Sequence, residues 1–541
     1  MKRIHGKTMQ SFALYFFLFV TVGMSRGTAG ESQPVWNVKH FGAIGDGKIL
    51  DTRAIQSAID SCAKQGGKVM VPSGTYLSGT LFLRSRVTLQ IAEGATLLGS
   101  TRLADYPERI PAVRSYNDLF LKYSLIYAEG QENIAIEGPG TIDGQGGSFP
   151  VVAREKPARY KDRPYILRMV QCNGVRVEDL RMRNSAMWMQ HYLACDNVAL
   201  RGLNVYNHCN NNNDMMDIDG CRNVVVSDCI GDTDDDAITI KSTTGRSSQN
   251  VSITNCIVSS HCNAVKCGTE SIGGFKNISV SNLVVKPSAH PTKISGEYGG
   301  IGGIVLTLVD GGILDGITVS NVSIDGPETP IFLRLGDRGR TVEPDQPKPP
   351  AGRFRNVRIG QVVASGAGNI GCAIAGLPEH PIENVSLNHI RIAFKGGGTR
   401  GDAERVLEEK PDGYPESNMF GKLSAYGFFI RHGRNLSLDQ IDLSVESPED
   451  RPALVCEDVQ ELDLFGLRAT GSAACESLIR FAGVRNAMVA GCRVVSPIRA
   501  FVSIQGNQTE SIFLCGNDLR KAGKKYIAGQ GVNVLSIQTV P

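Results

Sequence analysis

The chain has 541 residues, with 57 Lys and Arg against 54 Asp and Glu, and its formal net charge is +3 at pH 7. The first thirty residues hold this small excess, since 53 basic and 54 acidic residues remain without them. With no basic tract elsewhere, the composition argues against nucleic-acid binding. The remaining chain of about 510 residues exceeds the usual size of one compact core. It therefore holds several domains or one core that grows lengthwise.

Residues 1–30 have the order of a secretory signal. Three basic residues, the last of them Lys7, precede an apolar run from Ser11 to Met24, and small residues follow up to Gly30. The run is shorter than the roughly 20 residues needed to span a bilayer, which argues against a membrane anchor. We expect removal of this segment on export, leaving a secreted, periplasmic or surface protein without a membrane span.

One amphipathic helix is predicted near the start of the mature chain, in the segment DTRAIQSAIDSCAKQGG. Asp51 is its N-cap candidate, and Gly66 and Gly67 end it. Its apolar face consists of Ala54, Ile55, Ala58, Ile59 and Cys62. A helix at this place would cover the open first coil of an elongated core.

A repeated phrase follows, in which Asn precedes alternating apolar and small polar residues and then a turn. Its copies are NIAIEG at Asn133, GVRVED at Gly174, NVALRG at Asn197, NVVVSD at Asn223, NVSITN at Asn250, NISVSN at Asn277, GITVSN at Gly316, NVRIGQ at Asn356, NVSLNH at Asn384 and NLSLDQ at Asn435. The copies from Asn197 to Asn277 recur at even steps of about 27 residues. A repeat of this length holds about three short strands and their turns.

These repeats predict an all-β fold, a right-handed parallel β-helix with one coil per repeat and an N-terminal capping helix. We expect a single domain over residues 31–541. The Asn that begins each repeat can hydrogen-bond its equivalent in the next coil, which would form a ladder. Larger gaps between repeats, including residues 286–303 and 395–425, hold inserted loops.

The 14 cysteines do not follow a metal-binding pattern, because no C-x-x-C pair occurs. Cys229 and Cys256 stand one step of the repeat apart in the same local phrase, DCI and NCI. Stacked free thiols on successive coils therefore explain the spacing at least as well as disulfides do.

Acidic residues are concentrated in NNNNDMMDIDGC, from Asn210 to Cys221, and in DTDDDAITIKS, from Asp232 to Ser242. Solvated turns would relieve the repulsion between such acids without any function. However, Asp214 and Asp235 are slightly less than one coil apart in the sequence, so they can lie on neighbouring coils about 5 Å apart along the axis. Adjacent coils can supply the separation of about 6.5–9.5 Å between the acid and base of an inverting glycosidase. Crowding would raise the pKa of one carboxyl.

Two of these segments resemble a known family. NNDMMDIDGCRNV resembles the N-x-D-G-I-D segment of glycoside hydrolase family 28, the polygalacturonase and rhamnogalacturonase family, and DDDAITIKS resembles its G-D-D-C-I-A-I-K-S. HFGAIGDG and GGKVMVPSGTYLSG also resemble that family, and the likeness extends over residues 36–330. The resemblance implies hydrolysis of an acidic, pectic polysaccharide. We expect a monomer that needs no metal or other cofactor.

The resemblance also implies roles for individual acids. Asp235 would be the general acid that protonates the departing glycosidic oxygen. Asp214 and Asp236 would share the base role on the attacking water, which gives inversion at the anomeric carbon. Asp217 would support the water site.

The family's G-H-G motif is not intact, and SSHCNAVKCGTES takes its place. His261 could reach the general acid and tune it, although a lone His on a turn is more often a solvated residue. Lys266 occupies a position that is apolar in the family, and we consider it a candidate for substrate binding together with Lys241.

The family's Arg-Ile-Lys motif would fall near HPTKISGEYGG, where Lys293 and His290 offer cations. Loss of the Arg weakens bidentate carboxylate recognition, so rhamnogalacturonan or another branched pectic chain is as well supported as polygalacturonan. Trp188 and His191 resemble the family's N-S-P-x-W-x-x-H segment. The indole would stack on a sugar face or close the edge of the core.

Two other function classes stay open. A calcium-dependent polysaccharide lyase shares the β-helix and also clusters aspartates, and Lys241 could serve as its base. A non-catalytic carbohydrate-binding β-helix is the other, and the pattern of Asp214, Asp235 and Asp236 argues against it. The long loops at 286–303 and 395–425 would favour attack at chain ends if they wall off one end of the cleft.

Overall fold

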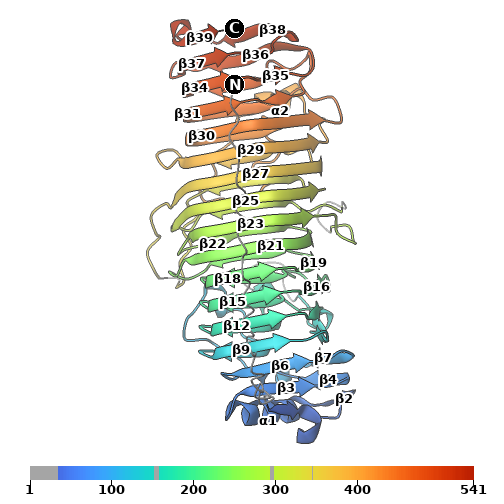
Figure 1. Ribbon diagram of the computed structural model, residues 1–541. Helices are drawn as coiled ribbons and strands as arrows, with labels where there is room; N and C mark the ends of the chain where they lie inside the picture. Colours follow the sequence, from blue (N-terminus) through green and yellow to red (C-terminus); the bar gives the residue numbers. More distant parts are fainter. Residues whose placement is uncertain (1–33, 152–157, 293–297, 344, 541) are drawn as a thin grey trace, which may run out of the picture.

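The computed structural model describes residues 34–151, 158–292, 298–343 and 345–540 (Figure 1). The chain winds into a right-handed parallel β-helix whose 39 described strands form one continuous sheet. Successive coils pair in parallel register along the whole length. This confirms the predicted fold class. The predicted signal at residues 1–30 lies outside the described residues, and none of the described helices is long and apolar enough to cross a membrane.

The strands form three parallel stacks. The first consists of β1 (Val35–Asn37), β3 (Gly67–Val71), β6 (Val87–Ile91), β9 (Glu132–Glu137), β12 (Asn173–Glu178), β15 (Asp196–Arg201), β18 (Arg222–Ser227), β21 (Ser248–Ser260), β23 (Phe275–Val285), β25 (Ile313–Asp325), β27 (Arg353–Ala367), β29 (Ile382–Phe394), β30 (Phe428–Val445), β31 (Leu454–Phe465), β34 (Arg485–Ala490), β37 (Glu510–Cys515) and β39 (Ile537–Val540). It contains the repeated phrase, so the phrase marks one face of the helix.

The second stack turns the corner from the first. It consists of β2 (Asp46–Leu50), β4 (Gly74–Ser78), β7 (Ala95–Gly99), β10 (Thr141–Asp143), β13 (Arg181–Arg183), β16 (Asn204–Asn207), β19 (Ile230–Thr233), β32 (Arg468–Ala469) and β35 (Arg493–Val494). Between β19 and β32 its place is taken by the second halves of the long strands β21 to β30, which run through both faces.

The third stack carries the acidic segments. It consists of β5 (Leu81–Phe82), β8 (Ser124–Glu129), β11 (Tyr165–Val170), β14 (Gln190–Leu193), β17 (Met216–Asp219), β20 (Ile238–Ser242), β22 (Asn263–Ser271), β24 (Gly302–Leu308), β26 (Thr329–Leu335), β28 (Cys372–Ala375), the first residues of β30 and β31, and then β33 (Ile479–Ala482), β36 (Ile498–Gln505) and β38 (Ala522–Ala528). Its strands bury residues on both faces over the middle of the molecule.

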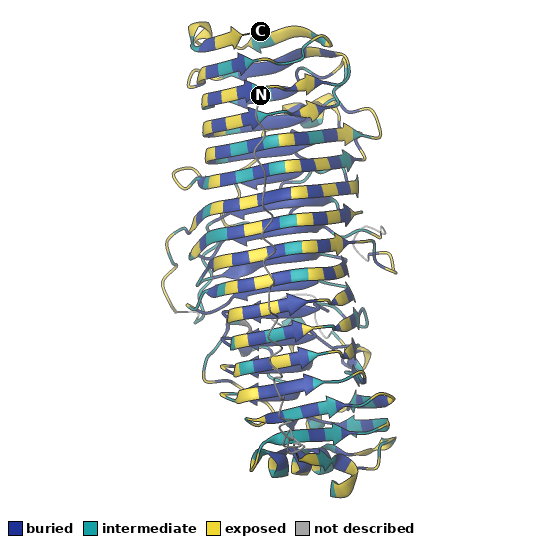
Figure 2. Cartoon of the chain, in the orientation of Figure 1, coloured by how far each residue is buried: buried dark blue, intermediate teal, exposed yellow. Residues whose placement is uncertain are grey.

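The core runs along the axis as stacked aliphatic side chains. In the first stack Val224, Val251, Ile278 and Ile317 are register partners on successive coils, and all four are buried. Buried and exposed residues alternate along these strands, as the dark blue and yellow bands of Figure 2 show. Each fully buried aliphatic side chain contributes about 1.5–3 kcal/mol relative to an exposed one. The alternation is therefore the pattern that selects the fold.

The predicted asparagine ladder is present on the outer face of the first stack. The Nδ2 of Asn197, Asn223, Asn250 and Asn277 each donates to the Oδ1 of the residue one coil earlier, at 2.8–3.3 Å. These residues also adopt a left-handed backbone, with φ between 52° and 57°. Asn tolerates this conformation better than most residues, which explains its recurrence at the start of each repeat.

The cysteines, all of which lie in described parts of the chain, have free thiols. Cys229 and Cys256 lie next to each other on successive coils, and each thiol donates to a backbone carbonyl, of Ser227 and Thr254 respectively. Their regular spacing therefore reflects packing in the core.

The predicted N-terminal helix is α1 (Thr52–Ala63), which lies at the end of the β-helix (Figure 1). It buries Ile55, Ala58, Ile59 and Cys62, most of the predicted apolar face. Asp51 is the N-cap residue by position, but its carboxylate does not cap the helix. It accepts hydrogen bonds from the backbone of the preceding loop instead, at 2.7 and 3.0 Å. A second, short helix is α2 (Arg400–Glu404).

Replacing Asn223 tests the ladder. Asn223→Ala removes two inter-coil hydrogen bonds and places in the left-handed region a residue that tolerates it less well than Asn, so we expect the free energy of unfolding to fall by about 2–3 kcal/mol. Asn223→Gly removes only the hydrogen bonds, and about half of that loss is expected. Chemical denaturation measures both, with Val225→Ala on the exposed face as the control. Equal losses for Ala and Gly would contradict the backbone contribution.

Candidate active site

The acids meet in the third stack, because the register of β17 and β20 aligns their preceding turns. Met216 of β17 pairs with Ile238 of β20, and these partners are closer together in the sequence than the usual repeat. Asp214 and Asp236 each lie two residues before these partners, and the backbone N–H of Met215 donates to the Asp236 carbonyl at 3.0 Å. Asp214 is therefore the register neighbour of Asp236, and it lies on the coil next to Asp235, as their spacing in the sequence predicted. Asp235 is the neighbouring residue on the same turn.

Asp235 faces a cavity of about 170 Å³. Its Oδ2 accepts a hydrogen bond from Asn212 at 3.1 Å, and its Oδ1 accepts one from the Asp236 backbone N–H at 2.9 Å. Burial, followed by repulsion from the Asp236 carboxylate, raises the pKa of Asp235 to about 6. The other residues that line the cavity are Arg159, Asn211, Asn212, Asp234, His261 and Cys262. Asp235 can thus hold a transferable proton next to open space.

Asp214 and Asp217 lie deeper, with 2% and 0% of their surfaces exposed. One oxygen of Asp214 and both oxygens of Asp217 are buried without a hydrogen-bond partner. Burial raises the pKa of both carboxyls well above the ordinary value, although Lys241 opposes the effect on Asp217. Because buried acceptors without donors disfavour a charge, these two groups are driven toward the protonated form.

Asp236 belongs to a buried ionic network. Lys266 Nζ lies 3.2 Å from Asp236 Oδ2 and 2.8 Å from Glu416 Oε1. The side chain of Asn263 donates to Asp236 at 2.7 Å and to Glu416 at 3.1 Å. Burial opposes the charge of Lys266, but the two carboxylates raise its pKa well above the ordinary value. The lysine is therefore a fixed cation that holds Asp236 and Glu416 in place.

Lys241 holds a second network on the adjacent coil. Its Nζ lies 3.5 Å from Asp217 Oδ1, 3.4 Å from Glu270 Oε2 and 4.7 Å from the centre of the Trp188 ring. Burial again opposes the charge, and Glu270 and Asp217 raise the pKa of Lys241 well above its usual range. Arg340 approaches Glu270 from the outside at 2.9 Å. Both predicted lysines are thus inside the site and paired.

The two predicted aromatic residues differ in position. His191 has no exposed surface, and its Nε2 lies 3.1 Å from Asp219 Oδ2. Its ring is 5.3 Å from the Trp188 ring and stacks on Tyr165 at 5.6 Å. Trp188 retains 7% exposure. Both rings are therefore buried, and Trp188 packs in an apolar cluster with Tyr160 and Tyr165, which fits the edge of the core better than an open sugar platform.

His261 lines the Asp235 cavity but contacts different groups from those expected. Its Nδ1 lies 3.3 Å from Asp234 Oδ1, and its Nε2 faces the His290 carbonyl at 3.0 Å. The register explains this, because the His261 backbone N–H donates to the Thr233 carbonyl at 3.0 Å and so aligns His261 with Asp234. Lys293 lies outside the described residues.

Two sets of side chains bring potential metal ligands within 4.8 Å of one another: His208 with Asp234 and His261, and Asp235 with Asp236 and Cys262. Each set mixes carboxylates with nitrogen or sulfur. Ca²⁺ prefers six to eight oxygen ligands, so neither donor set suits it.

The sequence did not point to Glu416, Glu270 or Asn263. Asn263 had a detectable signal, since it lies one step of the repeat after Asp236. Glu416 had none, because it lies in a loop that follows 150 residues after Lys266. The loop at 395–425 was expected to border the cleft, but neither the repeat nor a motif singles out Glu416 within it.

Comparison with known proteins shows the family of this chain. The model of the glycosyl hydrolases family 28 matches residues 62–394, more than half of the chain. The chain belongs to this family. The match includes every described acid and lysine of the site except Glu416.

Two curated relatives of this family 28 chain cover only part of it. It is 30% identical over 212 residues to a "Probable polygalacturonase" of Vitis vinifera, covering 37% of this chain and 43% of the relative. It is 28% identical over 261 residues to an "Exo-poly-alpha-D-galacturonosidase" of Dickeya chrysanthemi, covering 40% and 43%. The chain therefore spans less than half of the length of these relatives.

Solved structures share the fold. The family 28 exopolygalacturonase of Yersinia enterocolitica matches with a TM-score of 0.60 and 22% identity, over 80% of this chain and 78% of that one. A hyperthermoactive exopolygalacturonase of Thermotoga maritima matches with a TM-score of 0.59 and 19% identity, over 76% and 92%.

Substitution of Lys266 tests how much the buried network contributes to stability. Lys266→Met leaves Asp236 and Glu416 without their cation, so we expect the free energy of unfolding to fall by about 3–5 kcal/mol. Lys266→Met combined with Glu416→Gln removes one of the uncompensated charges and should recover part of this loss. Chemical denaturation measures both variants.

The matched control is Lys348→Met, which breaks an exposed pair with Asp337. Exposed pairs contribute about 0–1 kcal/mol, so this variant should stay close to the wild type. If the double variant were less stable than Lys266→Met by the full cost of a separate Glu416→Gln, the two residues would not be coupled.

Proposed function

We propose that this chain hydrolyses glycosidic bonds of a pectic polysaccharide by general acid and base catalysis, with inversion at the anomeric carbon. The observation that carries the proposal is the pair of turns at Asp214 and Asp235–Asp236. They place a carboxyl of raised pKa on an open cavity, beside two stacked carboxyls on neighbouring coils. Because pectic polymers lie outside cells, we also infer that residues 1–30 direct export.

Asp235 is the general acid. Its proton passes to the glycosidic oxygen as the bond from that oxygen to the anomeric carbon breaks. A raised pKa serves this step, since the group must still be protonated near neutral pH. The hydrogen bond from Asn212 fixes the orientation of the carboxyl toward the cavity.

Asp236 and Asp214 share the base role on the opposite side. Water attacks the anomeric carbon, and its proton passes to Asp236, which Lys266 and Asn263 hold in place. Asp214 stacks on Asp236 and is driven toward protonation, so the two carboxyls can share one proton, as in other carboxyl pairs. Asp217 supports this pair through Lys241.

A lyase reaction is less well supported by the same residues. It needs a base to remove a proton from the sugar ring, and a lysine serves as a base when its pKa is lowered. Neighbouring carboxylates instead raise the pKa of both Lys241 and Lys266, so each keeps its proton. The mixed donor sets near the acids also lack the oxygen ligands of a calcium site.

We further infer attack at chain ends. A segment that we call the cover, residues 399–425, packs on the outer face of the third stack beyond β22. Its side chains Leu407, Phe420 and Leu423 form an apolar cluster with Val305, Phe332 and Ala373 of β24, β26 and β28. The same segment places Glu416 on Lys266. The cover thus closes the sheet face on one side of the acids, and the curated relative from Dickeya chrysanthemi has an exo-acting name.

Product analysis tests the reaction class. We expect the wild type to release new reducing ends from polygalacturonan or rhamnogalacturonan, without unsaturated products and without inhibition by EDTA. Asp235→Asn keeps the shape of the side chain but has no proton to donate, so the rate should fall about 10²–10⁴-fold. Unsaturated, EDTA-sensitive products would identify a lyase. A chain that binds these polymers without releasing products would be a binding protein.

The pH dependence tests the assignment of Asp235. The acid acts only when protonated, so we expect kcat to fall about tenfold per pH unit above an apparent pKa of about 6. The Glu416 carboxylate contributes to the raised pKa. Glu416→Gln should therefore move this limb toward lower pH. A limb that stays in place in Glu416→Gln and also in Asp235→Glu would assign the titration to another group.

A further inference from the structure

A second polar cavity lies on the same face of the β-helix as the acids. Its volume is about 350 Å³. Arg480 of β33 lines it, and Arg480 belongs to the same outward column as Lys266. The register partners that connect the two residues are Val305, Phe332, Ala373, Phe429 and Val455. Six coil steps of about 4.8 Å separate the sites by on the order of 30 Å, and the cover lies between them.

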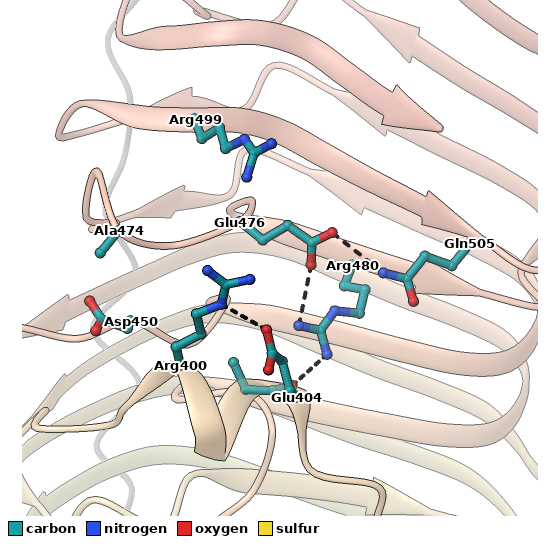
Figure 3. Close-up of a pocket in the computed structure, with 9 residues that line it drawn as sticks. Arg400, Glu404, Asp450, Ala474, Glu476, Arg480, Arg499 and Gln505 are labelled. Atoms are coloured by element: carbon teal, nitrogen blue, oxygen red, sulfur yellow. Dashed lines mark hydrogen bonds and ion pairs between the residues drawn. The ribbon is translucent and has the colours of Figure 1, made fainter. Parts of the chain in front are cut away.

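Charged side chains from separate elements converge on this cavity (Figure 3). Arg400 comes from α2, Arg480 from β33 and Arg499 from β36. Arg400 and Arg499 direct their guanidinium groups into the same space from opposite sides, and Asp450 and Glu476 flank them. The site is therefore assembled from segments about a hundred residues apart in sequence.

Contacts within the described part of the chain do not satisfy all the donor groups of these arginines. Arg499 makes no ion pair with any described residue, and it is exposed to the cavity. Arg480 donates one Nη to the Ala403 carbonyl at 2.7 Å and reaches Glu476 only at 3.5 Å, while its buried Nε has no partner. Arg400 is satisfied by Glu404 within α2. Two facing guanidinium groups repel each other, and an anion between them would relieve that repulsion.

The acceptors around the arginines are held in place. Glu476 receives a hydrogen bond from Ser503 at 2.9 Å and one from Gln505 at 3.5 Å, which fix its carboxylate at the cavity wall. Asp450 is held by Ser472 at 3.1 Å. Carboxylates that are fixed in this way accept hydrogen bonds from hydroxyl groups. A ligand that fits both features carries one carboxylate and several hydroxyls.

We propose that this cavity is a second binding site for a uronate residue of an acidic glycan, separate from the catalytic acids. The uronate carboxylate lies between Arg499 and Arg400, and its hydroxyls donate to Glu476 and Asp450. The volume is at the lower end of the range of small-ligand pockets, which suits one or two sugar units. This inference rests on the proposed function for the identity of the glycan, but the binding chemistry does not depend on hydrolysis.

The position of the cover limits which part of a glycan the second site can hold. A glycan in the catalytic site cannot continue along the sheet face to Arg480, because the cover packs on the coils between them. The second site therefore holds another chain, or a distant part of the same chain. It increases the local concentration of polymer at the enzyme without contacting the reacting bond.

Binding of trigalacturonate to the full-length chain tests the site. The Asp235→Asn variant is used because it should leave the trigalacturonate uncleaved during the titration. Calorimetry with this variant should resolve two binding sites. Adding Arg499→Glu reverses the charge at the cavity and should weaken one of them at least tenfold, while the other is unchanged. The matched control is Arg53→Glu, an exposed arginine of α1 at the other end of the molecule, which should leave both sites intact.

Kinetics supply the second measurement. In the otherwise wild-type chain, Arg499→Glu should raise KM for polygalacturonan several-fold and leave kcat, and both constants for trigalacturonate at the catalytic site, unchanged. A single site that is insensitive to Arg499→Glu, or equal effects of Arg499→Glu and Arg53→Glu, would overturn the proposal. If the wild type does not hydrolyse polygalacturonan but Arg499→Glu still abolishes one binding site, the proposed function fails and the second site stands.

Discussion

Parallel hydrogen bonding between successive coils is the constraint on which the rest of this structure depends. It holds each coil in register with the next, so a side chain that points outward lies about 4.8 Å from its partner on the following coil. In the third stack this rule builds one column from His191 through Asp217 and Thr239 to Lys266. The candidate catalytic acids Asp214, Asp235 and Asp236 lie in the turns that precede β17 and β20, so the rigidity of this ladder fixes their geometry.

The same register creates an electrostatic problem that the two lysines solve. Stacking places Asp214, Asp217, Asp235 and Asp236 close together in a buried region, where charges are costly. Lys241 and Lys266 each contact carboxylates on two sides, so each lysine compensates one acid of the cluster and one glutamate from outside it. Burial raises the pKa of Asp214, Asp217 and Asp235, and Lys241 opposes this effect on Asp217 without cancelling it. In the proposed mechanism the fixed carboxylate is Asp236, which Lys266 holds, and the proton donor is its neighbour Asp235.

The sequence predicted the fold well because its signal is repetitive. Alternating burial, the asparagine ladder and the capping helix each depend on local patterns, and all are present. Asp214 and Asp235 lie on neighbouring coils as their spacing predicted, but the register that sets Asp214 opposite Asp236 was not predicted, and the coil length explains it. The connection from β16 to β17 spans residues 208–215, whereas that from β19 to β20 spans residues 234–237, so this coil is shorter than the coil before it. Glu416 was missed because no local pattern distinguishes it from the other acids of a loop that was expected only to border the cleft.

Because the site includes Glu416 of the cover, its parts come together at different times during folding. Lys266, Asn263 and the acids precede Glu416 in the chain by about 150 residues or more, and three further coils, marked by β24, β26 and β28, lie between them. As the chain is synthesised from its N-terminus, the acids can stack while Lys266 still lacks one of its two carboxylate partners. The centre reaches its final charge balance only after those coils have formed the surface on which the cover packs. Completion of the candidate active site is therefore a late event in the folding of this molecule, although most of its residues are encoded early.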